Sequence, residues 1–311
     1  MRVTANSFPN RLVNQLGDLA SRQARLQNQA ATGQRVQLPE DDPRAMRRVL
    51  DMQTEARSID QYGDNIGRIK ESTTAAYSAM SSLKKLNDRA GEIATLADGL
   101  KSPQELNIYG QEIDQMIEEG VQTANMTHRG DYLFAGSAVD KPPFTVTRDA
   151  NGKITAVNYT GDKTAFTAEI SNNVQSEGAP IGANTSGSGP RGLITDSRSG
   201  ADYFAHLISL RDHLQAGDTK AVADTDRANV AKDEENLLYH YGHIGAIQSR
   251  LDAASSLGKD QSFSLEQQVS GLVDADLSQT LVRLTQVQNA YTAALQTGGS
   301  ILNKSLLDYL R

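Results

Sequence analysis

The residues that could do chemistry in this chain are a glycine-rich hexapeptide, two helical histidines and several acidic pairs. The hexapeptide GSGPRG at 187–192 has the G-x-G-x-x-G spacing of a dinucleotide-binding turn. Such a turn follows a strand and opens a helix at its second glycine, whereas Pro190 stands in a stretch rich in Ser and Gly. We therefore interpret the hexapeptide as a loop.

His240 and His243 share an expected helix with Glu234 and Glu235, which lie one or two turns earlier. This grouping could ligate a metal, but zinc sites usually take a further ligand from a second element, and no sequence feature marks one. We interpret both histidines as ordinary core or surface residues. No metal and no other cofactor is predicted.

Paired carboxylates occur at Asp41/Asp42, at Glu118/Glu119 and within 233–235. Adjacent side chains diverge on a helix, so neither member can assist the other as general acid or base. The G-x-S-x-G, P-loop and H-E-x-x-H motifs are absent from the sequence. We predict that the protein is not an enzyme, with a metal-binding helical protein as the least favoured alternative.

Composition and charge argue against several classes of protein, including disulfide-bonded, nucleic-acid-binding and membrane-inserted ones. The 311 residues include no Cys, which excludes disulfides and thiolate sites, and aromatic residues make up only 5%. The net charge of −7 argues against nucleic acid as a partner, and no apolar run is long enough for membrane insertion. The N-terminus lacks the apolar core of a signal peptide, so we expect a cytoplasmic protein or export without cleavage.

Both ends of the chain carry an apolar stripe at helical spacing, from about 7 to 32 and from 274 onward. The opposite faces are polar but mostly uncharged, which indicates burial on both sides. We predict an assembly interface, against the alternative of an intramolecular bundle. Its residues are Phe8, Leu12, Leu16, Leu19 and Leu26 at the N-terminus, and Leu277, Leu281, Leu284, Tyr291, Leu295, Leu302 and Leu306 at the C-terminus.

The two stripes are expected to pair with each other. Residues 1–33 carry a net charge of +3 and residues 277–311 carry +2. Because the whole chain has a net charge of −7, the segment between them carries −12. We expect the N-terminal helix to meet Leu277, Leu281, Leu284 and Leu295. The polar face with Gln279, Gln286 and Asn289 is expected to meet neighbouring subunits.

The chain between the ends predicts more helices, with clear start and stop signals. Gly33 is suited to end the first helix, and Asp42 and Pro43 to cap and begin a long second one. Ser102, Pro103 and Glu105 restart a helix with a capping box. Further helices are expected near 203–214, after Asp218 to about 254, and from a new cap at Ser262 into the C-terminal stretch.

A β-rich insert is predicted at 138–191. Strand-like runs at 144–148 and 153–160 flank the turn DANG and predict a hairpin, and 166–170 predicts a third strand. The tail at 177–192 has the composition of a loop. We thus predict a mainly α protein, an elongated helical rod with paired terminal helices and a small β-rich insert domain. Its domains would be 1–41 with 275–311, 42–137 with 192–274, and 138–191.

Three segments resemble the flagellin superfamily and, within it, the junction proteins between hook and filament. The run QNQAATGQRVQLPEDDPRAM at 27–46 is similar to the family's junction after its first helix. GDYLFAG at 130–136, with PPF at 142–144 and YTGD at 159–162, is typical of the junction proteins and not of flagellin. The stretch from Asp274 is similar to the shared C-terminal helix.

The resemblance implies a structural component of the bacterial flagellum, an adaptor between hook and filament on which flagellin assembles. A short flagellin filament subunit is the alternative. It implies a ring of copies, with a hook-associated protein on the hook side and flagellin on the filament side. It further implies type III export to an extracellular location without a cleaved signal peptide, and an export chaperone that binds the C-terminal helix.

Overall fold

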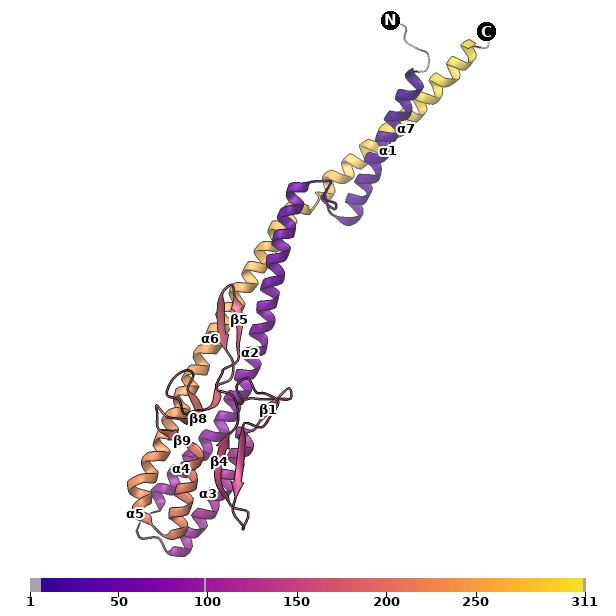
Figure 1. Ribbon diagram of the computed structural model, residues 1–311. Coiled ribbons are helices and arrows are strands. Elements are labelled where there is room, and N and C mark those ends of the chain that lie inside the picture. The colour runs from indigo at the N-terminus through magenta and orange to yellow at the C-terminus, as the bar shows by residue number, and fades with distance from the viewer. Residues whose placement is uncertain (1–6, 98, 310–311) are drawn as a thin grey trace. The chain divides into compact units, whose positions relative to one another are not determined.

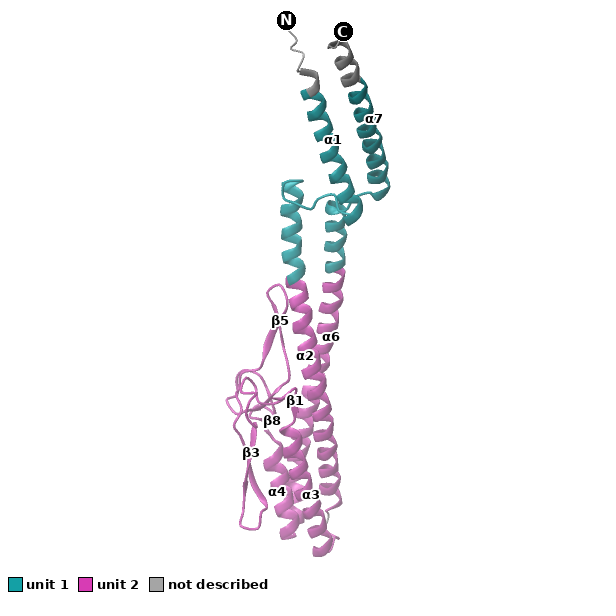
Figure 2. Cartoon of the chain, turned by 90° about the vertical axis from the view of Figure 1, so that its right-hand side faces the viewer, with its two compact units in different colours: residues 1–57, 261–311 teal, residues 58–260 magenta. Residues whose placement is uncertain are grey.

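The computed structural model describes residues 7–97 and 99–309, and these are mainly helical, as the sequence predicts (Figure 1). They form two compact units, which we call unit 1 (1–57 with 261–311) and unit 2 (58–260) (Figure 2). The helical elements are α1 (Ser7–Thr32), α2 (Pro43–Leu96), α3 (Pro103–Ala124), α4 (Tyr203–Ala216), α5 (Thr219–Ala221), the π-helix η1 (Val222–Asp226), α6 (Arg227–Val273) and α7 (Leu277–Tyr309).

The predicted helix signals at the first three boundaries are confirmed. Gly33 ends α1 with φ +73°, a conformation that costs glycine little. The Asp42 carboxylate accepts a hydrogen bond from the Ala45 N–H at 3.0 Å, and Pro43 begins α2. Ser102 and Glu105 form the capping box of α3. These features depend on residues only a few positions apart, which is why the sequence reveals them.

The prediction of a new helix at Ser262 is wrong, because α6 runs without a break from Arg227 to Val273. Gly258 lies inside it, and a Cβ at that position would meet the Ile59 side chain at 3.5 Å. A glycine that reads as a stop signal in the sequence thus lies inside a continuous helix, next to α2. The break falls instead at 274–276, after which the Asp276 carboxylate caps α7 by accepting the Gln279 N–H at 3.0 Å.

The strands all lie in unit 2. They are β1 (Thr127–His128), β2 (Asp131–Tyr132), β3 (Phe144–Arg148), β4 (Ile154–Tyr159), β5 (Thr167–Ser171), β6 (Val174–Glu177), β7 (Ile181–Asn184), β8 (Gly192–Asp196) and β9 (Ala201–Asp202). The predicted hairpin is confirmed, since β3 pairs antiparallel with β4 and Phe144 lies opposite Tyr159. The predicted loop at 177–192 instead contains β7, which pairs parallel with β8.

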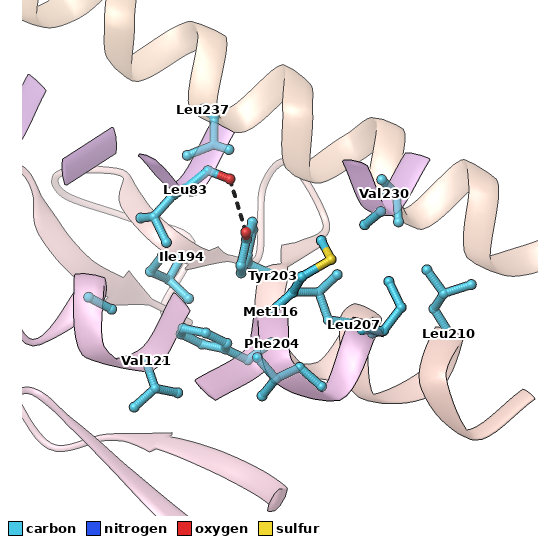
Figure 3. Packing of buried hydrophobic residues seen from close by; sticks show 14 of the residues in the cluster. Leu83, Met116, Val121, Ile194, Tyr203, Phe204, Leu207, Leu210, Val230 and Leu237 are labelled. Atoms are coloured by element: carbon cyan, nitrogen blue, oxygen red, sulfur yellow. Dashed lines mark hydrogen bonds between the residues drawn. The ribbon is translucent and has the colours of Figure 1, made fainter. Parts of the chain in front are cut away.

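Helices and strands of unit 2 share a large hydrophobic core (Figure 3). Tyr203 and Phe204 at the start of α4 are buried, and the Tyr203 hydroxyl donates to the Leu83 carbonyl oxygen on α2 at 3.0 Å. From the hairpin, Phe144 and Ile154 join the same core. The insert and the helices around it bury apolar side chains together. The division into three domains proposed from the sequence stays a prediction.

Candidate assembly surface on the terminal helices

In unit 1, α1 and α7 form an antiparallel pair (Figure 2). Backbone hydrogen bonds fix where the pair begins. The Ala275 N–H donates to the Gly33 carbonyl oxygen at 2.8 Å, and the Arg35 N–H donates to the Val273 carbonyl oxygen at 2.6 Å. The end of α1 and the start of α7 are thereby held side by side, so the two apolar stripes run past each other.

The loop between α1 and α2 has its own internal structure, which the sequence analysis treats only as a connection. Val36 is buried, and the Arg35 guanidinium donates to the Leu272 carbonyl oxygen at 2.7 Å. Backbone N–H groups of Leu38 and Gln37 donate to the Asp41 carboxylate and lower its pKa. The acidic pair thus serves the loop and the cap of α2. Its D-D-P pattern is the signal in the sequence.

The seam between α1 and α7 follows a heptad pattern, with spacings that alternate between three and four residues. A Cβ on Gly298 would lie 2.4 Å from Leu12 Cδ2, so the helices approach closely there. Small residues on α7 allow this approach. The buried and half-buried positions include Leu12, Leu16, Leu19, Gln23, Leu26 and Ala30 on α1, and Thr280, Leu284, Val287, Tyr291, Ala294 and Gly298 on α7.

The four leucines expected to meet the N-terminal helix are not all covered to the same extent. Leu284 is half-buried in the seam, but Leu277, Leu281 and Leu295 remain 48%, 53% and 48% exposed. The apolar stripe of α7 is wider than one partner helix can cover. Small residues of α7 such as Thr280 and Gly298 lie in the seam with α1, and one edge of the stripe stays exposed. We call Leu277, Leu281 and Leu295 the outer edge.

The other predicted interface residues divide between the seam and the rest of the chain. Leu12, Leu16, Leu19, Leu26 and Tyr291 are half-buried in the seam, as the stripe predicts. Phe8, Leu302 and Leu306 lie outside the residues whose side chains are described. The polar residues Gln279, Gln286 and Asn289 are exposed. Whether any of these residues contacts a neighbouring subunit stays a prediction.

Comparison with known proteins shows similarity to flagellar proteins. Residues 5–139 match the model of the bacterial flagellin N-terminal helical region. Flagellar hook-associated protein 3 of Escherichia coli (strain K12) is 25% identical over 291 residues, which is 86% of this chain and 86% of that protein. In sequence, the chain is thus similar to flagellin-family proteins over its N-terminal part and to a flagellar hook-associated protein over most of its length.

Solved structures show that the fold is also shared with flagellar proteins. One, described as a flagellar hook-associated protein from Vibrio parahaemolyticus, has a TM-score of 0.63 and 16% identity and covers 75% of this chain and 100% of that one. The flagellar junction protein FlgL from Legionella pneumophila has a TM-score of 0.55 and 12% identity, with 73% and 100% covered. The mainly helical flagellin-type fold expected from the sequence is therefore confirmed.

The candidate residues for chemistry have separate partners in the structure. The His240 ring lies 3.1 Å from the Gly192 carbonyl oxygen, and burial lowers the pKa of His240 to about 4. His243 faces Glu177 at 3.5 Å, so the two histidines do not converge. Over 7–97 and 99–309, no three His, Asp or Glu side chains form a group that could hold a metal. None of the helices in those ranges is long and apolar enough to cross a membrane.

The acidic pairs are likewise split between different contacts. Glu118 forms an ion pair with Arg148, and the hydrogen bonds from this guanidinium lower the pKa of Glu118. Asp233 is buried, accepts the Asp202 N–H at 3.0 Å and contacts the His206 ring at 2.8 Å. The contacts of Glu118 and Asp233 are thus made with basic side chains and backbone from other parts of the chain.

Proposed function

We propose that this protein is a structural, non-enzymatic component of the bacterial flagellum that joins hook and filament. The observation that carries the proposal is the outer edge on α7, in a chain whose relatives are named flagellar hook-associated proteins. Those names favour the junction over a short flagellin filament subunit. GDYLFAG, which resembles the junction proteins, favours it as well.

The outer edge supplies an interface that a single copy cannot satisfy. Each of its three leucines is about half exposed, and burying the remainder contributes roughly 1 kcal/mol per side chain. That is too little for a stable dimer. In a ring or tube, however, every copy offers such a surface to a neighbour through a head-to-tail contact, and the contributions add. The exposed Gln279, Gln286 and Asn289 would supply hydrogen bonds at the rim.

The partners follow from this role. Copies of the chain would form a ring, with a hook-associated protein on the hook side and flagellin on the filament side. The location would be extracellular, after type III export without a cleaved signal peptide. An export chaperone would cover α7 before assembly, because an apolar edge that is exposed in the monomer needs protection from nonspecific association.

Replacement of all three outer-edge leucines by Gln tests the assembly role. We expect the variant to be exported and to keep the α1–α7 seam, but to leave filaments unattached, so that flagellin accumulates in the culture medium. The matched control replaces Val13 and Val282, which are exposed on the same two helices but lie off the outer edge. It should support normal filaments.

Measurements on the secreted protein separate assembly from export and folding. The amount of each variant in the medium reports export, and circular dichroism of the purified chain reports helix content. Normal filament attachment by the triple variant would refute the role of the outer edge. A variant absent from the medium would instead place the defect before assembly, in export or in the contact with the chaperone.

A further inference from the structure

A pocket of about 420 Å³ in unit 2 lies between α6 and the loop that contains the GSGPRG hexapeptide. Its lining includes Pro180, Ile181 and Pro190 as well as Arg191, Tyr239 and His243. Apolar surface and an arginine thus meet in one cavity. Neither the coiled-coil seam nor the proposed assembly role uses these residues.

Buried side chains hold the loop around Arg191 on both sides. Before it, Asn184 Nδ2 donates to the carbonyl oxygens of Ser188 at 2.7 Å and of Pro190 at 2.6 Å. After it, the Gly192 carbonyl oxygen accepts from Asn236 Nδ2 at 2.9 Å and contacts His240 Nε2 at 3.1 Å. Asn184, Asn236 and His240 are each at most 2% exposed. The backbone that carries Arg191 is therefore positioned in advance.

The Arg191 guanidinium lies over an aromatic ring. Its Cζ is 4.2 Å from the centroid of the Tyr239 ring, a cation–π contact that fixes the plane of the group. Within the described part of the chain, Arg191 has no ion pair with a carboxylate and donates no hydrogen bond. Stacking uses the face of a guanidinium and leaves the N–H groups at its edge available. The N–H groups of Arg191 can therefore donate hydrogen bonds to a ligand.

The other arginine of the pocket, Arg198, already has a counter-charge. Arg198 donates to both carboxylate oxygens of Asp196, at 3.1 and 2.8 Å, and to the Gly189 carbonyl oxygen at 2.9 Å. His243 faces Glu177 at 3.5 Å. One cation, Arg191, thus remains without a counter-charge, and the negative charge of Glu177 disfavours a ligand with two charges at one centre, such as a phosphate dianion.

We propose that this pocket binds a carboxylate, held by the edge of Arg191 above Tyr239. A planar carboxylate matches the guanidinium fork with two parallel hydrogen bonds. The apolar lining residues Pro180, Ile181 and Pro190 would accept a short methylene chain attached to the charged group. The ligand class is therefore a short-chain carboxylate, either free or as the acidic side chain of a second copy of the protein.

Titration of the full-length protein with glutarate tests the site. The chain has only five histidines, so the ring signals of His240 and His243 can be followed by NMR in ¹³C-histidine-labelled protein at pH 7. We expect a saturable shift with glutarate and none with glutaramide, its uncharged isostere. Arg191→Gln should weaken binding about tenfold or more, because hydrogen bonds to a charged partner contribute on that scale.

Arg250→Gln is the matched control. Arg250 lies on the same helix, is exposed, and donates to the Gln175 carbonyl oxygen at 3.0 Å, so its loss should leave glutarate binding unchanged. Equal affinity in the wild type and in Arg191→Gln, an equal response to glutaramide, or no saturable shift would overturn the proposal. Inorganic phosphate binding as tightly as glutarate would overturn the assignment to a carboxylate.

Sedimentation of the same proteins identifies the source of the carboxylate. If a second copy supplies it, Arg191→Gln should self-associate less than the wild type, and added glutarate should reduce self-association of the wild type. If glutarate binds but the wild type and Arg191→Gln sediment alike, the occupant is a free carboxylate. Either result supports the site, and neither depends on the proposed role at the junction.

Discussion

Protonation of His240 is expected to destabilise unit 2 in mild acid. The ring is 2% exposed and its Nε2 lies 3.1 Å from the Gly192 carbonyl oxygen, a hydrogen bond that neutral imidazole can donate. Burial lowers the pKa of His240 from 6.5 to about 4. A lowered pKa means that the unfolded chain binds the proton more readily than the folded chain, so stability is lost as the pH falls below 6.5.

The size of the effect follows from the two pKa values. Between pH 6.5 and pH 4.5 the unfolded histidine is protonated while the folded one stays largely neutral. Each pH unit in this window costs up to about 1.4 kcal/mol of unfolding free energy. We therefore expect His240 to remove about 2.5 kcal/mol between pH 7 and pH 4.5. The loss levels off as the pH falls through the folded pKa of about 4.

Comparison with His240→Gln isolates this contribution. The Gln side chain can donate to the same carbonyl oxygen but does not titrate, and carboxylates common to both chains cancel in the difference. Urea unfolding can be followed by tyrosine fluorescence, because Tyr291 and Tyr309 are the only tyrosines outside unit 2. The variant should lose about 2.5 kcal/mol less than the wild type between pH 7 and pH 4.5. An equal loss in both chains would refute the reasoning.

Two further substitutions test the fold of unit 2. Gly192→Ala would place a Cβ 2.2 Å from the Thr195 carbonyl oxygen and 2.4 Å from the Asn184 backbone nitrogen, and we expect a loss of about 3 kcal/mol in urea unfolding. Unchanged stability would contradict this close backbone approach. Ser102→Ala removes the side-chain cap of α3 and should cost about 1 kcal/mol, seen as faster amide exchange at Glu105, whereas unaltered exchange there would count against the cap.

Local signals account for the features that the sequence predicted correctly. The capping box at Ser102 and Glu105, the stop at Gly33 and the hairpin around DANG each depend on a few consecutive residues. The heptad spacing of α1 likewise places Leu12, Leu16, Leu19 and Leu26 on one face whatever the partner is. These predictions hold because backbone hydrogen bonding and side-chain direction are fixed within one or two turns.

Contacts between distant residues decided the features that the sequence did not reveal. The segment Ile181–Asn184 was predicted as loop because it is short and lies in a stretch rich in Gly and Pro. Burial and pairing with β8 make it the strand β7. Gly258 looks like a helix stop until Ile59 packs beside it. In the same way, Arg191 becomes a candidate ligand-binding residue only where Tyr239, far along the chain, lies beneath it.

The terminal helices combine both kinds of information. The sequence by itself determined that each end forms an amphipathic helix and that the two stripes need a partner. Only the tertiary structure decided which edge of the α7 stripe faces α1, leaving Leu277, Leu281 and Leu295 exposed. The physical reason is that a periodic stripe defines a face but not its contact line, which is set by where small residues such as Gly298 let the two backbones approach.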